Sequence, residues 1–172
     1  IFSFSLFCAL IHCAELWHRR PATLESALLG VVIGMIGLVR IPNLLPAAVI
    51  VLLYGIRGRT DFRVKMRFLV DYRMQIGVAV MSAALVFSPQ TWYWKEMTRH
   101  WIVQPYYYEG FNFFRPRISD VLFSVRRGWW LWSPLALVAC FGFFAMREKN
   151  PEYILPFAAA LLVHLYLVSV WH

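Results

Sequence analysis

Residues 28–43 read LLGVVIGMIGLVRIPN, an apolar run that ends at a basic residue followed closely by a proline. Gly30 and Gly34 form a GxxxG pair and Gly37 continues the same helical face, a spacing that lets two membrane helices approach closely. Pro42 lacks a backbone donor and therefore interrupts a helix. The stretch predicts an apolar helix that packs tightly on a neighbour and breaks just before this proline.

The chain as a whole is far more apolar than a soluble domain. Of its 172 residues, 60% belong to the set AVILMFWYC and 15% are charged, whereas soluble domains average about 45–50% and about 25%. This composition excludes a disordered chain, a coiled coil and an ordinary soluble enzyme. The apolar residues occur in blocks bounded by arginines, a pattern typical of multi-span membrane proteins.

These blocks predict an all-α membrane protein, a single transmembrane helical domain over residues 1–172 with about six transmembrane or half-membrane helices. A full span needs about 20 residues, so the shorter blocks either extend into their flanks or form half-helices shielded by neighbours. Both ends of the sequence fall inside apolar runs, and we therefore expect an internal part of a larger membrane protein. The predicted helices cover 1–16, 24–39, 44–56, 74–87, 129–146 and 153–171.

Lysine and arginine predict the orientation of these helices. The connection 57–73 holds six basic and two acidic residues, so we expect it on the cytoplasmic side, where it meets anionic lipid headgroups. Counting outward places 40–43 and the long loop 88–128 outside. The loop is also basic, but long loops cross membranes largely regardless of charge. The formal net charge of +8 does not indicate nucleic-acid binding, because no soluble basic module is present.

The predicted outer loop 88–128 alternates aromatic residues with arginines. One interpretation is an aromatic belt at the headgroup level. The other is a lid or groove whose aromatics stack on sugar rings or a lipid chain while its arginines bind lipid phosphates. Its candidate sugar or lipid contacts are Tyr106, Tyr107, Tyr108 and Phe111, its candidate phosphate ligands are Arg115, Arg117, Arg126 and Arg127, and its candidate catalytic carboxylates, each alternatively a salt-bridge partner, are Glu109 and Asp120.

Arg40 is a further candidate, since it ends an apolar run and has no acidic neighbour in the sequence. An ionisable residue at membrane depth is a functional hypothesis by default, and a guanidinium binds two phosphate or carboxylate oxygens at once. The alternative is snorkelling, in which the side chain reaches the outer interface. No CxxC or Cys/His spacing indicates a metal site.

Two stretches resemble bacterial GT-C membrane glycosyltransferases, which include protein O-mannosyltransferases and aminoarabinose transferases. Residues 28–43 look like the family's Gly-rich "LLGLLLGLAVLTRP" helix, with Arg-Ile-Pro-Asn in place of Arg-Pro. Residues 122–134, LFSVRRGWWLWSP, resemble its "LFS-x-R-x-G-L-x-x-W-S-P" element, where an outer loop enters the next span. The order of these elements fits a middle section of such an enzyme.

The resemblance implies a transferase of the bacterial inner membrane that moves a sugar from a polyprenyl-phosphate donor to an acceptor at the outer face. It implies a catalytic Asp or Glu in a first outer loop that precedes this chain. Negative charge develops on the leaving phosphate, and arginines or a divalent metal can stabilise it. The expected partners are membrane lipids, the sugar donor and other membrane subunits. Two alternatives stay open, a non-catalytic membrane subunit of a larger complex and a lipid or solute transporter.

Overall fold

A computed structural model describes residues 2–56, 59–103, 112–125 and 128–171, and every regular element in these ranges is a helix. The prediction of an all-α protein is therefore confirmed for the described part of the chain. The helices are α1 (Phe2–Arg19), α2 (Thr23–Val39), the 3-10 helix η1 (Ile41–Asn43), α3 (Leu44–Leu53), α4 (Arg59–Asp71), α5 (Arg73–Thr98), α6 (Ile118–Phe123), α7 (Trp129–Trp132), α8 (Pro134–Lys149), the 3-10 helix η2 (Pro151–Tyr153) and α9 (Ile154–Val170).

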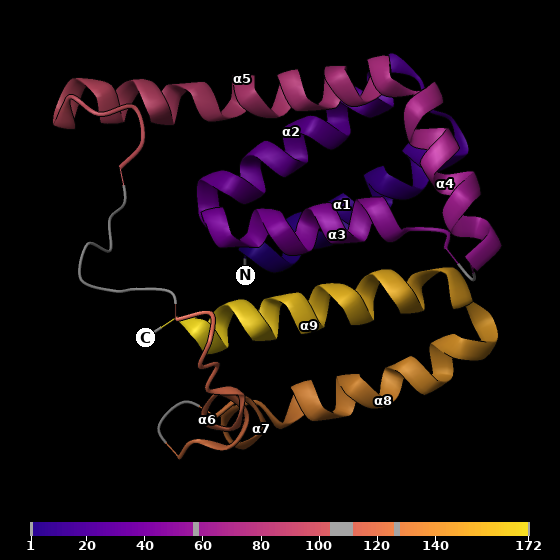
Figure 1. The fold of residues 1–172 in the computed structure, drawn as a ribbon, viewed down its shortest axis with the longest axis vertical. Coiled ribbons are helices and arrows are strands. Elements are labelled where there is room, and N and C mark those ends of the chain that lie inside the picture. Colours follow the sequence, from indigo (N-terminus) through magenta and orange to yellow (C-terminus); the bar gives the residue numbers. More distant parts are fainter. Residues whose placement is uncertain (1, 57–58, 104–111, 126–127, 172) are drawn as a thin grey trace.

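The long helices lie with their axes roughly aligned, and α4 crosses one end of them (Figure 1). α1, α3 and α8 run toward this end, whereas α2, α5 and α9 run away from it. We call the end covered by α4 the α4 end. The opposite end, where α2 finishes and α3 begins, is called the Arg40 end. Short connections account for the alternation of α1, α2 and α3 and of α8 and α9, whereas residues 99–133 join α5 to α8.

Each of the six predicted spans overlaps one of the long helices. By length and composition, α5 and the segment Pro151–Val170 are apolar and long enough to cross a membrane. α2, Ile41–Leu53 and Val138–Arg147 are shorter apolar helices. These properties are compatible with a membrane protein, and the six-span arrangement stays a prediction.

The loop predicted over 88–128 is shorter than expected, because α5 continues through Pro89. Proline lacks the N–H that would reach the main-chain oxygen of Leu85. The Ser88 hydroxyl donates to that oxygen at 2.8 Å instead, which compensates the lost helical hydrogen bond. α6 also lies within the predicted loop. The boundary of the predicted span 74–87 was therefore placed too early.

The connection predicted over 57–73 contains α4, which ends at Asp71 and is separated by one residue from α5, which begins at Arg73. α4 packs on the bundle through Phe68 and Leu69, which contact the core, and through Lys65, which is 7% exposed. These positions recur at helical spacing, so one face of α4 is covered by the bundle. The basic connection is therefore an amphipathic helix with a docked face and an exposed face.

α2 and α5 pack closely through small residues. A Cβ added at Gly30 would collide with the main-chain oxygen of Ala79, and one added at Gly34 would lie 2.9 Å from the oxygen of Ala83. The two glycines and the two alanines are each four residues apart, so matching small faces meet along the helix pair. The prediction that the GxxxG spacing serves helix packing is confirmed.

The core joins α1, α2, α3 and α9. A buried hydrogen bond crosses it, in which Trp17 Nε1 donates to Ser26 Oγ at 2.9 Å, and the Ser26 hydroxyl donates to the Ala22 oxygen at 2.8 Å. This arrangement gives the indole N–H a partner away from water. The buried apolar cluster consists of Leu10, Ala14, Trp17, Leu29, Val32, Ile36, Ala47, Ile50 and Ala160.

Candidate functional site

The predicted break after α2 is confirmed and forms one wall of a recess at the Arg40 end. Arg40 caps α2 by donating its N–H to the Ile36 oxygen at 3.0 Å, and its own oxygen accepts the N–H of Asn43 at 3.0 Å. The chain then turns through η1 into α3. The recess is lined by Arg40, Pro42 and Asn43 from this break and by His164, Leu167, Val168 and Trp171 from α9 and the residue after it.

Arg40 provides the positive charge of this recess. Its side chain is exposed, and within the ranges that the structure describes no ion pair joins it to an acidic side chain. The recess has a cavity volume of about 20 Å³, which is room for about one water molecule. The site is therefore large enough for an oxygen of an anionic group at its mouth, but not for a lipid chain.

His164 connects the two stretches that resemble the glycosyltransferases. It lines the recess with Arg40, and its ring stacks on that of Trp129 in α7 with 6.0 Å between centroids. His164 thus shares a recess with Arg40 of the Gly-rich stretch and stacks on Trp129 of the Trp-Ser-Pro stretch.

The segment 112–117 reaches the same end of the molecule through main-chain hydrogen bonds to the last turn of α9. The N–H of Asn112 donates to the Val170 oxygen at 2.8 Å, and the N–H of Arg117 donates to the Ser169 oxygen at 2.9 Å. The Tyr166 hydroxyl donates to the oxygen of Phe113 at 2.9 Å. The guanidinium groups in this segment, those of Arg115 and Arg117, are exposed.

α9 separates these arginines from Arg40. The recess contacts α9 at positions 164, 167 and 168, whereas the segment 112–117 contacts it at 166, 169 and 170. At 100° per residue these two sets occupy opposite faces of the helix. Arg40, Arg115 and Arg117 therefore share an end of the molecule without lining one described pocket.

The remaining predicted site residues fall into two groups. Asp120 lies in α6 with an exposed side chain. Arg126, Arg127, Glu109, Tyr106, Tyr107, Tyr108 and Phe111 lie outside the described residues.

A polar network at the α4 end was not predicted from the sequence. Lys65 of α4 points into the bundle, where its Nζ contacts His18 Nε2 of α1 and donates to the Tyr54 oxygen after α3 at 2.9 Å. The rings of His18 and Phe68 stack with 5.6 Å between centroids. Lys65 thus links α4 to α1 and to the C-terminal end of α3.

The protonation of His18 follows from these contacts. Burial, and then the charge of Lys65, lower the pKa of His18 from 6.5 to about 4, so the ring is neutral at pH 7. With Nε2 accepting from Lys65, the proton is assigned to Nδ1, which donates to the Ala14 oxygen at 2.6 Å. Burial also lowers the pKa of Lys65 from 10.5 to about 8.

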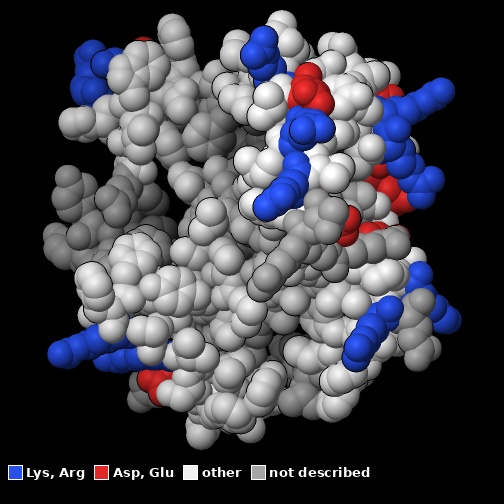
Figure 2. Space-filling view, turned by 45° about the vertical axis from the view of Figure 1, so that its right-hand side comes forward, with Lys and Arg blue, Asp and Glu red and all other residues white. Residues whose placement is uncertain are grey.

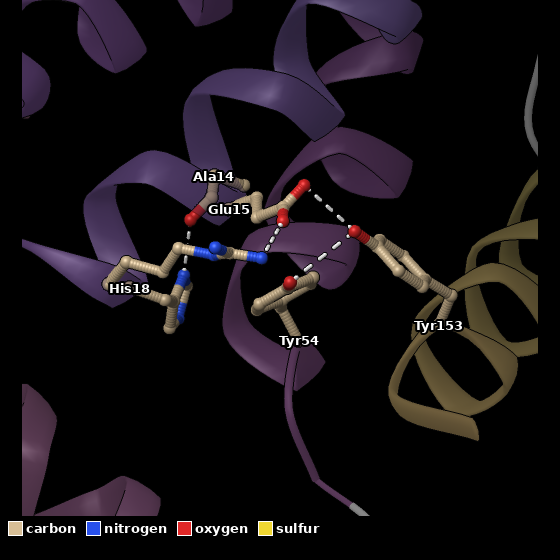
Figure 3. A network of polar contacts seen from close by, with 6 residues as sticks. Ala14, Glu15, His18, Tyr54 and Tyr153 are labelled. Atoms are coloured by element: carbon tan, nitrogen blue, oxygen red, sulfur yellow. Dashed lines mark hydrogen bonds and ion pairs between the residues drawn. The ribbon is translucent and has the colours of Figure 1, made fainter. Parts of the chain in front are cut away.

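Tyrosines continue the network toward η2 (Figure 3). The Tyr153 hydroxyl donates to Glu15 Oε2 at 2.9 Å and lies 3.5 Å from the Tyr54 hydroxyl. Glu15 also pairs with Arg19 one turn later, at 2.6 Å. These contacts tie the C-terminal ends of α1 and α3 to η2. A structural role accounts for each group of this network.

Within the part of the chain that the structure describes, no three histidine, cysteine, aspartate or glutamate side chains gather as a metal site would require. Searches for a matching family model, a related curated protein and a similar solved structure found none. In its described ranges the chain is a helical bundle compatible with a membrane, with a recess that Arg40 lines at one end and the docked helix α4 across the other.

Proposed function

We propose that the chain is part of a membrane glycosyltransferase that transfers a sugar from a polyprenyl-phosphate donor at the outer membrane face. In this proposal the six long helices cross the membrane, the Arg40 end faces outward and the α4 end faces the cytoplasm. The resemblance of residues 28–43 and 122–134 to GT-C enzymes supports the activity, and the apolar helices support the location.

The observation that carries the proposal is the convergence at His164. Arg40 from one resembling stretch lines the same recess as His164, and Trp129 from the other stretch stacks on the His164 ring, although the two stretches are far apart in the sequence. Convergence of the two stretches is expected if they build one site. Arg40 adds a guanidinium that no described acidic side chain neutralises.

Arg40 suits the role of a phosphate ligand at the mouth of the recess. A guanidinium presents two parallel N–H groups to an anionic group, and charge-assisted hydrogen bonds are stronger than neutral ones. Glycosyl transfer leaves negative charge on the departing lipid phosphate, and a fixed cation beside it lowers the barrier. Arg115, Arg117, Arg126 and Arg127 are proposed as further phosphate ligands, and Glu109 and Asp120 as candidate carboxylates.

Photolabelling of the protein in proteoliposomes tests this proposal. The probe is a polyprenyl phosphate that carries a photoreactive group, and the variants are Arg40→Ala and Arg147→Ala, the latter at the α4 end. Loss of a charged hydrogen bond is worth about 1.5–3 kcal/mol, so Arg40→Ala should weaken labelling about 10- to 100-fold. Arg147→Ala should label like the unchanged protein.

The same experiment defines what contradicts the proposal. Equal labelling of Arg40→Ala and the unchanged protein would remove Arg40 from the site. Excess unlabelled polyprenyl phosphate should compete with the probe for labelling. If excess phosphatidylglycerol competes equally well, the site binds lipid phosphates in general, and a polyprenyl-specific donor site is excluded.

A non-catalytic membrane subunit is the second candidate. α5 has no buried residue in the isolated chain, and its exposed apolar side chains suit contact with another membrane helix as well as with lipid. This function predicts that the protein co-purifies in a fixed ratio with another membrane protein while Arg40→Ala has no effect on probe labelling.

A further inference from the structure

α4 has an exposed apolar stripe on a face that the bundle does not cover. Its docked face is formed by Lys65, Phe68 and Leu69. The stripe recurs every four residues, which places its members on one side of the helix. It consists of Phe62, Met66 and Val70, which are 53%, 47% and 62% exposed.

Basic side chains border this stripe. Arg63 and Arg67 each follow a stripe residue by one position, and Arg73 follows α4 at the start of α5. All three side chains are exposed. Figure 2 shows basic side chains projecting from the side of the molecule on which α4 lies. The exposed face of α4 is therefore apolar along one line and positively charged beside it.

We propose that this face of α4 is a binding site for acidic phospholipid headgroups. Phe62, Met66 and Val70 enter the boundary between headgroups and acyl chains, and Arg63 and Arg67 bind the phosphates. A helix with an apolar stripe and arginines beside it lies in the plane of a membrane surface in this way. Acidic lipids add attraction for each arginine near the surface.

The direction of α4 supports a lipid as the occupant. α4 crosses the end of the aligned helices (Figure 1), so in a membrane that those helices span it lies along the surface. An interfacial helix needs this orientation, whereas a helix that docks a soluble partner does not. The positive charge of the arginines is also complementary to the negative charge of acidic headgroups.

Lys65 supports the same conclusion from the docked face. A lysine turned inward, in contact with His18 Nε2 and the Tyr54 oxygen, fixes α4 against the bundle. Arg63 and Arg67 then lie at exposed positions of the same docked helix. The inference requires the membrane location in the proposed function but does not depend on the donor site at Arg40.

Spin labels on α4 test this inference in proteoliposomes of phosphatidylcholine and phosphatidylglycerol in equal amounts. Single cysteines replace Phe62, Arg63, Met66, Arg67 and Val70 in turn, in a background in which Cys8, Cys13 and Cys140 are alanine. We expect accessibility to oxygen to peak at 62, 66 and 70, and accessibility to a water-soluble nickel chelate to peak at 63 and 67.

A second measurement tests the headgroup preference at the same place. A fluorophore at Met66→Cys is quenched by brominated phosphatidylglycerol or by brominated phosphatidylcholine, and the ratio gives the local lipid preference. Arg63→Gln with Arg67→Gln should lower the preference for phosphatidylglycerol by up to about 25-fold, at about 5-fold for each arginine. Arg147→Gln with Lys149→Gln, on α8 at the same end, is the matched control and should leave it unchanged.

Each other outcome overturns the inference. Labels at 62, 66 and 70 that both reagents fail to reach would mean that another protein covers the stripe. Nickel accessibility at all five positions would mean that the stripe faces water. An unchanged quenching ratio after substitution of both arginines would exclude headgroup binding by this face of α4. These measurements do not depend on probe labelling at Arg40, so failure of this inference and failure of the proposed function are distinguishable.

Discussion

Gly30 of α2 lies against the main-chain oxygen of Ala79 of α5, so closely that a side chain at this position has no space. The contact involves backbone on both helices, and neither side can yield by changing a rotamer. The approach of α2 to α5 therefore depends on the absence of a Cβ at Gly30, as it also does at Gly34.

Gly30→Ala should separate α2 from α5 and lower the stability of the protein. Overpacking a close contact costs about 1–3 kcal/mol, and we expect a lower thermal unfolding temperature in detergent. Gly77→Ala in α5 is the control, because a Cβ there meets no atom within 4 Å. The two variants unfolding at the same temperature would show that the close approach is not needed.

Acidification should weaken the docking of α4 through His18. The pKa of His18 is about 4 in the folded protein and 6.5 for an ordinary histidine, so between these values the unfolded chain binds more protons. The contribution of neutral His18 to the free energy of unfolding is fully present above pH 6.5. It is lost as the pH falls toward 4, and the loss is at most about 3 kcal/mol.

His18→Gln provides the comparison for this pH dependence, since glutamine retains an acceptor for Lys65 but does not titrate. Unfolding temperatures at pH 7.5 and pH 5 should differ more for the unchanged protein than for the variant. Carboxylates that titrate in this pH range change the unfolding temperatures of the unchanged protein and of His18→Gln equally. The same difference in both would mean that His18 is not held neutral by its surroundings.

Ser26→Ala should leave the Trp17 indole N–H buried without an acceptor. A buried donor that loses its partner costs about 1–3 kcal/mol, and the unfolding temperature should fall accordingly. Trp17→Phe removes the donor itself, so adding Ser26→Ala to it should cost much less than Ser26→Ala alone. Additive losses in the double variant would contradict the hydrogen bond between Trp17 and Ser26.

Ser88→Ala should loosen α5 at Pro89. The Leu85 oxygen then loses the hydroxyl that replaces the missing proline N–H, which costs about 1 kcal/mol. Hydrogen exchange of the amides around Leu85 measures the local opening and should be faster in the variant. Thr91→Ala, which removes a hydroxyl that bonds the oxygen of Ser88, is the nearby control. It should leave exchange at Leu85 unchanged.

The sequence predicts the helices well because the signals that define them are local. Apolar blocks mark each long helix, Pro42 marks the break, and the Gly30–Gly34 spacing marks a close helix contact. The extension of α5 through Pro89 was missed because the compensating hydroxyl of Ser88 is visible only in the folded geometry. The sequence predicts a connection where α4 lies, because the charges of this segment outweigh its short apolar stripe.

The α4-end network could not be predicted because its partners are distant in sequence. His18 and Lys65 are 47 positions apart, and Glu15 and Tyr153 are 138 positions apart. A single sequence contains no signal that pairs them. The sequence likewise placed Arg40 and Arg117 on one side of the membrane but contained no information about which face of α9 each would approach.

The position of α9 between Arg40 and Arg117 sets a minimum size for anything that engages both. A helix with its side chains is about 10–12 Å across, so the main chain at these two arginines is separated by about the diameter of α9. A compact anion can sit on one flank, whereas an extended ligand with two separated negative groups can wrap around the helix tip. Charge spacing along the ligand, rather than total charge, would then govern selectivity.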